Sequence, residues 1–338
     1  MNRFKIRKTK MLDEAVLGHK KQGIFLTTVI FVLVYIIGST LSSVVQSIPL
    51  SIYSITSLMS STEYNALMEQ FMADQISYTD FMLGMVDVVE SLVVNLPFWI
   101  SLISLFSTAL IIVASVVYCV KFEKRPVSSM GIRKKDFALE YGLGFLIGAV
   151  MYGLSFLITF LTGTIEISFN EFSPVIFLFL LAFVVQGASE EFLVRGYYMV
   201  SLARDNKIAV AIALSSIFFG IMHIGNAGVS FIAIINIILM GIFLGIYVFK
   251  RGDLWGACAI HTSWNFVQGN IFGSLVSGMR MDKPLFITNT VGDATFVHGG
   301  AFGLEGSLCV TLVLLLAILA VLLIGTKKSE ISDFDIAE

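Results

Sequence analysis

Seven residues of this sequence fall into three short groups whose types and spacing could do chemistry. They are Glu190, Glu191, Arg195, Phe219, His223, His261 and Asn265. The first group lies inside Gln186–Arg195, a polar stretch within a very apolar part of the chain. Ionisable groups at bilayer depth cost at least a few kcal/mol each, so they indicate a functional site unless a structural role accounts for them.

The first group divides into a pair and a single residue. On a helix, Glu191 and Arg195 are four residues apart and can form a buried ion pair. Glu190 points about 100° away from Glu191, because an α-helix has 3.6 residues per turn. The pair is predicted to fix the helix, and Glu190 stays free to face a partner. Gly187 and Ala188 are small enough to allow another helix to approach closely.

The other two groups are predicted to reach the same depth in the membrane. His261 and Asn265 share one helix face because they are four residues apart. At about 1.5 Å per residue, Glu190 lies roughly 21 Å from Arg204, His223 roughly 24 Å from Lys207, and His261 and Asn265 roughly 15 and 21 Å from Arg251. Each reference residue is a basic residue of a predicted cytosolic loop.

Two histidines, a free glutamate and an asparagine at one depth favour the activation of water. Glu190 could act as general base, and His223 could bind and polarise the water. His261 and Asn265 could donate hydrogen bonds to the oxyanion of a tetrahedral intermediate. Alternatively, Glu190, His223 and His261 could ligate zinc with water as fourth ligand, although the sequence contains no HExxH motif. Taken singly, each group also has a structural reading, as an ion-pair lock, an interhelical hydrogen bond or a packing residue such as Phe219.

The composition places these groups in a membrane protein. Hydrophobic residues make up 57% of the chain and charged residues 14%, with a mean hydropathy of +0.88. A soluble domain carries about 25% charged residues. Long uninterrupted apolar runs exclude an outer-membrane barrel and predict an all-α, polytopic helix bundle. The three cysteines all fall in apolar runs, and neither disulfides nor thiolate metal ligation is expected.

The apolar runs predict about eight spans with cytosolic N- and C-termini. The spans are expected at about 24–47, 95–120, 138–162, 174–200, 208–224, 230–249, 254–275 and 304–325. Of the 22 Lys and Arg residues, 19 fall in segments that this arrangement places in the cytosol. The predicted divisions are a cytosolic basic tail (1–23), the transmembrane bundle (24–325) with the catalytic core at 174–275, and a cytosolic tail (326–338).

Residues 49–93 are predicted to form an outside loop. They contain six acidic residues and no Lys or Arg, and the spacing of apolar residues between Tyr64 and Leu92 predicts one or two amphipathic helices. The remaining histidines, His19 and His298, lie in polar segments and are predicted to be on the surface.

The three groups resemble the signatures of a known family. Glu-Glu-x-x-x-Arg at 190–195, Phe-x-x-x-His at 219–223 and His-x-x-x-Asn at 261–265 look like the motifs of the CPBP family of CAAX proteases and bacteriocin-processing or immunity proteins, also called the abortive-infection family. The resemblance covers about 174–275. It implies an eight-helix intramembrane endopeptidase in which Glu190 and His223 activate water, His261 and Asn265 form the oxyanion site, and Glu191 and Arg195 support them. The family is described both as metalloproteases and as glutamate-dependent proteases, and we favour the glutamate mechanism with no required cofactor.

The expected partners are a membrane-associated peptide or protein substrate and the lipid bilayer, with no nucleic acid. The substrate would be a CAAX-type protein or a precursor of a peptide or bacteriocin. The protein is expected in a cell membrane, and the compact chain is typical of a bacterial plasma membrane protein. One alternative is a non-catalytic immunity or regulatory protein on the same scaffold. A transporter with a proton relay is disfavoured, because no inverted repeat of broken helices is found.

Overall fold

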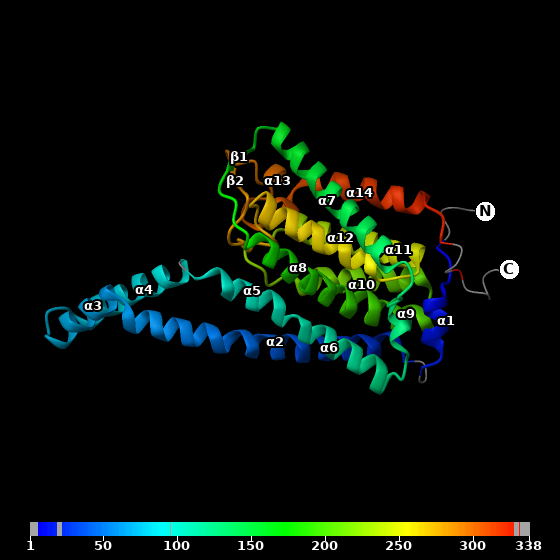
Figure 1. Cartoon of the computed structure of the whole chain (residues 1–338), viewed down its shortest axis with the longest axis horizontal. Helices are drawn as coiled ribbons and strands as arrows, with labels where there is room; N and C mark the ends of the chain where they lie inside the picture. Colours follow the sequence, from blue (N-terminus) through cyan, green and yellow to red (C-terminus); the bar gives the residue numbers. More distant parts are fainter. Residues whose placement is uncertain (1–5, 19–21, 95, 328–330, 332–338) are drawn as a thin grey trace.

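The computed structural model describes residues 6–18, 22–94, 96–327 and 331, and their fold is almost entirely helical (Figure 1). Residues 1–5 of the predicted basic tail, His19 and residues 332–338 of the acidic tail lie outside the described residues. The prediction of an all-α polytopic bundle is confirmed.

Seven apolar helices and the more polar helix α12–η4 lie in the described ranges near the eight predicted positions. Five are long and apolar enough to cross a membrane. They are α2 (Ile24–Ser60), α5–α6–η1 (Phe98–Ser107, Ala109–Val117 and Tyr118–Phe122), α7 (Phe137–Leu161), α8–η3–α9 (Ile176–Glu191, Phe192–Met199 and Val200–Asp205) and α11 (Phe231–Arg251). The shorter ones are α10 (Ile208–Met222), α12–η4 (Trp255–Phe266 and Val267–Ile271) and α14 (Leu308–Leu323).

The first span is longer than predicted. Helix α2 continues past residue 47 to Ser60 and includes Pro49, so the first residues of the expected loop belong to the helix. Its 37 residues measure about 55 Å, well beyond the roughly 30 Å of a hydrocarbon core. Helices α3 (Thr62–Met72) and α4 (Tyr78–Val94) complete a hairpin that extends past the bundle (Figure 1). The predicted amphipathic helices are therefore present as two elements.

Short elements close the two ends of the bundle. They are α1 (Lys10–Val16), η2 (Val127–Met130), β1 (Ile165–Phe169), β2 (Phe286–Thr290), α13 (Thr295–His298), η5 (Gly300–Phe302) and η6 (Leu304–Gly306). Strands β1 and β2 pair antiparallel and tie together two segments predicted as plain loops. The surface prediction for His298 is wrong, because that side chain is buried with 4% exposure in the folded segment that precedes α14.

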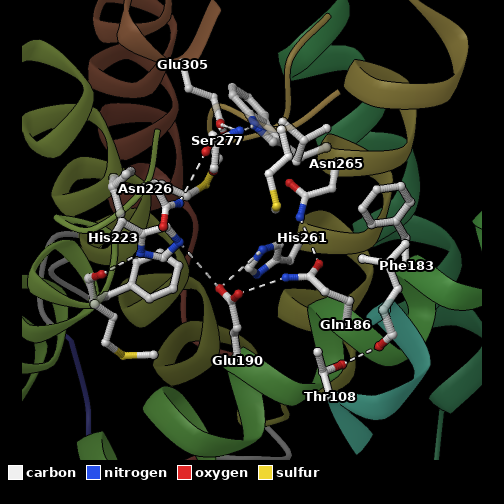
Figure 2. A pocket seen from close by; sticks show the side chains of 18 of the residues that line it. Thr108, Phe183, Gln186, Glu190, His223, Asn226, His261, Asn265, Ser277 and Glu305 are labelled. Atoms are coloured by element: carbon white, nitrogen blue, oxygen red, sulfur yellow. Dashed lines mark hydrogen bonds and ion pairs between the residues drawn. The ribbon is translucent and has the colours of Figure 1, made fainter. Parts of the chain in front are cut away.

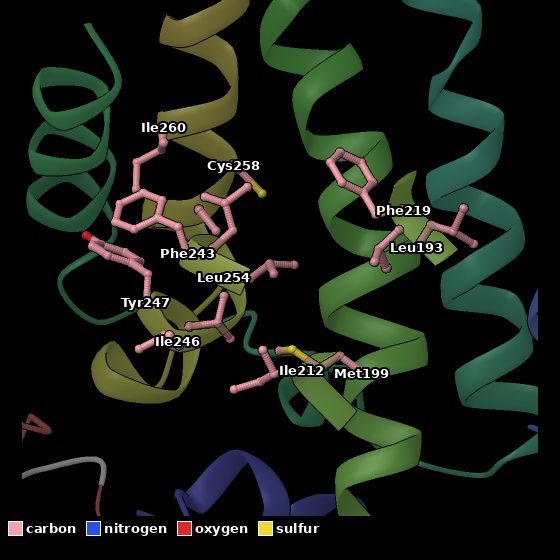
Figure 3. Close-up of a cluster of buried hydrophobic side chains, with 14 of the residues drawn as sticks. Leu193, Met199, Ile212, Phe219, Phe243, Ile246, Tyr247, Leu254, Cys258 and Ile260 are labelled. Carbon is pink, nitrogen blue, oxygen red and sulfur yellow. The ribbon is translucent and has the colours of Figure 1, made fainter. Parts of the chain in front are cut away.

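Small residues bring the helices of the site together. A Cβ atom on Gly187 of α8 would lie 3.0 Å from the backbone nitrogen of Thr262 on α12, so the predicted close approach at Gly187 is confirmed. On the other side of α12, Gly144 and Gly148 of α7 lie directly against its backbone. Buried side chains from η3, α10 and α12, among them Leu193, Phe219 and Cys258, belong to one hydrophobic cluster (Figure 3). Helix α12 is thereby held between α7 and α8.

Candidate active site

The residues singled out in the sequence converge on one cavity of about 290 Å³. Glu190 comes from the end of α8, His223 caps the C-terminus of α10, and His261 and Asn265 come from α12. All four line the cavity, and Glu190 points between the two histidines (Figure 2). The predicted convergence of these residues from three helices is therefore observed.

Glu191 and Arg195 form the predicted ion pair, and the pair also holds a histidine. Arg195 Nη1 donates to Glu191 Oε1 over 3.0 Å, and both side chains are fully buried. The same oxygen accepts a hydrogen bond of 2.9 Å from His261 Nδ1. The orientation of the His261 ring is thus set by a carboxylate that Arg195 neutralises.

Phe219 packs against three members of the site. The Arg195 guanidinium lies over its ring at 4.2 Å from the centroid, a favourable cation–π geometry. Its ring also meets the rings of His223 and His261 edge to face, with centroids 4.9 and 6.1 Å apart. Phe219 therefore does more than fill space, because one ring contacts the buried cation and both imidazoles.

The two carboxylate oxygens of Glu190 have different surroundings. Oε1 accepts a hydrogen bond of 2.8 Å from Gln186 Nε2. Within the described part of the chain, Oε2 has no hydrogen-bond partner. It lies 3.9 Å from His223 Nε2 and 3.7 Å from His261 Nε2. These separations exceed a direct hydrogen bond and suit polar groups that share a water molecule.

The tautomers of both histidines follow from their other ring nitrogens. His223 Nδ1 lies 2.8 Å from the Phe219 carbonyl oxygen, which can only accept. His261 Nδ1 faces the ionised Glu191, which also only accepts. Each Nδ1 therefore carries a proton, and in its neutral form each ring directs an acceptor Nε2 towards Glu190. Three acceptor atoms thus converge, and a proton on one ring or a bound donor is needed to satisfy them.

The zinc alternative concerns the same side chains. Within the described ranges, no group of three His, Cys, Asp or Glu residues is placed so that it could hold a metal ion. The Nε2 atoms of His223 and His261 lie 3.9 and 3.7 Å from Glu190 Oε2. No step of the mechanism proposed below involves a metal.

Gln186 is a pocket residue to which the sequence reasoning gave no role. Besides donating to Glu190, it accepts a hydrogen bond of 2.9 Å from Asn265 Nδ2 through its own Oε1 (Figure 2). The sequence did contain a signal, since Gln186 precedes Glu190 by four residues and shares its helix face. Its hydrogen bond with Asn265 joins two helices, and no residue spacing in the sequence indicates it.

Glu305 of η6 was also missed, and it closes the pocket rim. Its Oε1 accepts from Trp264 Nε1 at 3.1 Å, and its Oε2 accepts from the backbone and hydroxyl of Ser277 at 2.8 and 2.9 Å. The Ser277 carbonyl in turn accepts from Asn226, which follows α10. Glu305 therefore ties the segment after η4 to α12 and to the turn beyond His223.

A comparison with protein families adds an independent finding to this geometry. The family model described as type II CAAX prenyl endopeptidase Rce1-like matches residues 172–267. That range begins just before α8, ends after Asn265 and contains all seven residues singled out above. Comparisons with curated proteins and with solved structures gave no match.

Proposed function

Residues 172–267 carry a Rce1-like endopeptidase domain in a multi-pass membrane protein, and from that premise we propose that the chain hydrolyses a peptide bond of a membrane-associated peptide or protein inside the bilayer. The observation that carries the proposal is the position of Glu190. Its one oxygen without a hydrogen-bond partner in the described chain faces the Nε2 atoms of two oriented histidines in a cavity.

Glu190 is assigned the role of general base. A water molecule bound between Glu190 Oε2 and His223 Nε2 would give a proton to Oε2 while its oxygen bonds to the carbonyl carbon of the substrate. Collapse of the tetrahedral intermediate would break the C–N bond. The proton on Glu190 would pass to the departing amine, so the products are a free carboxyl group and a free amino group.

His261 and Asn265 are assigned to the developing oxyanion. Asn265 uses one amide hydrogen on Gln186 and keeps the second for the pocket. His261 can donate through Nε2 only as the imidazolium, and the carboxylates of Glu190 and Glu191 on either side favour that form. Donors of this kind typically contribute 10²–10³-fold to the rate.

The cavity supports an extended, largely apolar substrate. Besides the polar residues, it is lined by side chains from the lipid-facing helix α2, including Tyr35 and Ser39. Methionines from three other segments, Met222, Met240 and Met279, add adaptable apolar surface. A peptide that is anchored in the membrane would reach such a site without leaving the bilayer. CAAX-type proteins and peptide or bacteriocin precursors both belong to this class.

The decisive experiment compares membranes that contain the wild-type chain with membranes that contain Glu190→Gln. New peptide N-termini would be identified by mass spectrometry after incubation with membrane proteins and peptides. Cleavage is expected to fall by about 10²–10⁴-fold in Glu190→Gln, as for the loss of a general base. The matched control is Glu69→Gln, the same change at an exposed position of α3. Equal cleavage by wild type and Glu190→Gln would refute the proposal and favour a non-catalytic immunity or regulatory role.

A further inference from the structure

Gln186 occupies a position between the two halves of the site. It lies one turn before Glu190 on α8 and contacts Asn265 across the interface with α12. Its two hydrogen bonds, of 2.8 and 2.9 Å, form a chain that runs from Asn265 through Gln186 to Glu190. No other described side chain donates a hydrogen bond to Glu190.

The direction of this chain is fixed by chemistry. The ionised Glu190 carboxylate can only accept, so the amide nitrogen of Gln186 must face it. The Gln186 oxygen therefore faces Asn265, and Asn265 must present its NH₂ group in return. One donor and one acceptor are both required at this position, and among the ordinary side chains of this length only glutamine supplies them without a charge.

We propose that Gln186 is a positioning residue that selects which Glu190 oxygen acts and fixes Asn265 relative to it. By holding Oε1, it leaves Oε2 directed at His223 and His261. By accepting one Asn265 hydrogen, it directs the other into the cavity. The assignment of Asn265 and Glu190 to chemistry rests on the proposed function, but the hydrogen-bonded chain itself does not.

Two substitutions separate the two bonds. Gln186→Met keeps the length of the side chain and removes both hydrogen bonds. Gln186→Glu keeps an acceptor for Asn265 but loses the donor to Glu190 and places a second carboxylate beside it. Gln75→Met is the matched control, because Gln75 is exposed in the turn between α3 and α4.

The first measurement needs no substrate. Dicyclohexylcarbodiimide reacts with protonated carboxyl groups in apolar surroundings, and its attachment at Glu190 can be followed by peptide mass spectrometry on the full-length protein in membranes. A hydrogen bond to a charged group contributes about 1.5–3 kcal/mol, so its loss should raise the rate of labelling at pH 7 by about 10-fold or more in Gln186→Met. Gln186→Glu should be labelled at least as fast, because two adjacent carboxylates resist joint ionisation. Gln75→Met should match wild type.

A second reagent tests whether faster labelling of Glu190 comes only from a more open pocket. Diethyl pyrocarbonate modifies neutral imidazole, so its rate at His223 reports access to the cavity. Positioning predicts a His223 rate within about twofold of wild type in Gln186→Met, since the expected effect is confined to the carboxylate. Faster modification of His223 in parallel with Glu190 would mean that the variant opens the site, and unchanged Glu190 labelling in both variants would equally overturn the proposal.

The activity readout then separates this inference from the proposed function. With a substrate found by the Glu190→Gln comparison, Gln186→Met should lower kcat by about 10–100-fold with KM within about threefold of wild type, because a general base that is free to rotate loses most of its contribution. If Glu190→Gln leaves cleavage intact while Gln186→Met still changes labelling, the protease proposal fails and the positioning role stands.

Discussion

Replacing Arg195 with methionine should destabilise the protein by leaving Glu191 charged and buried. Arg195 and Glu191 are both fully buried, and their Nη1 and Oε1 atoms are 3.0 Å apart. Within the described residues, no hydrogen-bond partner is found for three further atoms of the pair, which are Arg195 Nε, Arg195 Nη2 and Glu191 Oε2. The guanidinium is stabilised in addition by the Phe219 ring at 4.2 Å. The pair therefore depends on one bond, one ring and the donor from His261.

The size of the effect follows from these contacts. At 3.0 Å and an effective dielectric constant of about 20, the Coulomb attraction is about 6 kcal/mol, and desolvation of both charges offsets much of it. Breaking a buried pair by removing one partner typically costs about 3–5 kcal/mol, because the other charge stays buried without compensation. Removing both charges in Glu191→Gln/Arg195→Met should cost less than Arg195→Met alone, since the glutamine oxygen can still accept from His261 Nδ1.

Thermal unfolding of the purified protein in detergent tests this double-mutant cycle. Arg195→Met should lower Tm by roughly 4–7 °C, and the double variant should recover at least half of that loss. Arg280→Met, at an exposed position, is the control for the loss of a positive charge. If Arg195→Met unfolds at the wild-type temperature, or if the two single effects simply add in the double variant, Glu191 and Arg195 are not coupled as the structure places them.

Two further predictions concern the turn between α11 and α12 and the chemistry of the cavity. Burial, followed by the repulsion from Glu140, raises the pKa of Asp253 from 3.8 to about 6. The folded state then binds this proton more tightly than the unfolded state, so the free energy of unfolding should fall as the pH rises from about 4 to about 6. Asp253→Asn should remove that fall and raise the free energy of unfolding by about 2–3 kcal/mol at pH 7.5. Unfolding measured across this pH range checks both expectations. Purified protein should retain cleavage after exhaustive treatment with a chelator, with metal content followed by elemental analysis. Loss of cleavage on chelation and its return with zinc would instead assign Glu190, His223 and His261 as ligands.

Two kinds of feature of the site could be predicted from the sequence. They are contacts within one helix, and positions along a helix that depend only on the helical rise per residue. Hydropathy predicted eight helices near the positions where the described chain has them, and the four-residue spacing of Glu191 and Arg195 predicted their ion pair. The distance of each group from a basic loop predicted that Glu190, His223 and His261 would meet, because the rise per residue is nearly constant.

Contacts between helices could not be predicted, because they depend on how each helix is rotated about its axis, and the spacing of residues in the sequence does not give that rotation. That one oxygen of Glu191 serves both Arg195 and His261 depends on how α8 and α12 turn towards each other. The bond from Asn265 to Gln186 has the same origin. Glu305 reaches the rim only because residues 272–307 fold back over the site, and this path also buries His298. The pairing of β1 with β2 joins segments far apart in sequence and gave no local signal beyond short runs of β-branched residues.

In the proposed mechanism, the charges around Glu190 decide which imidazole carries a second proton. Glu190 and Glu191 carry two negative charges and Arg195 one positive charge, so these three leave one net negative charge in surroundings of low dielectric constant. Such a charge is costly unless it is compensated, and a proton on an imidazole compensates it. His261 is the better placed ring, because its Nδ1 lies 2.9 Å from Glu191 and its Nε2 lies 3.7 Å from Glu190, whereas His223 Nδ1 meets an uncharged carbonyl group. A protonated His261 would turn one of the three converging acceptors into a donor. In the mechanism proposed above, this donor serves the oxyanion and the Glu190 carboxylate serves as general base, and the buried Glu191–Arg195 pair holds the His261 ring in place for that role.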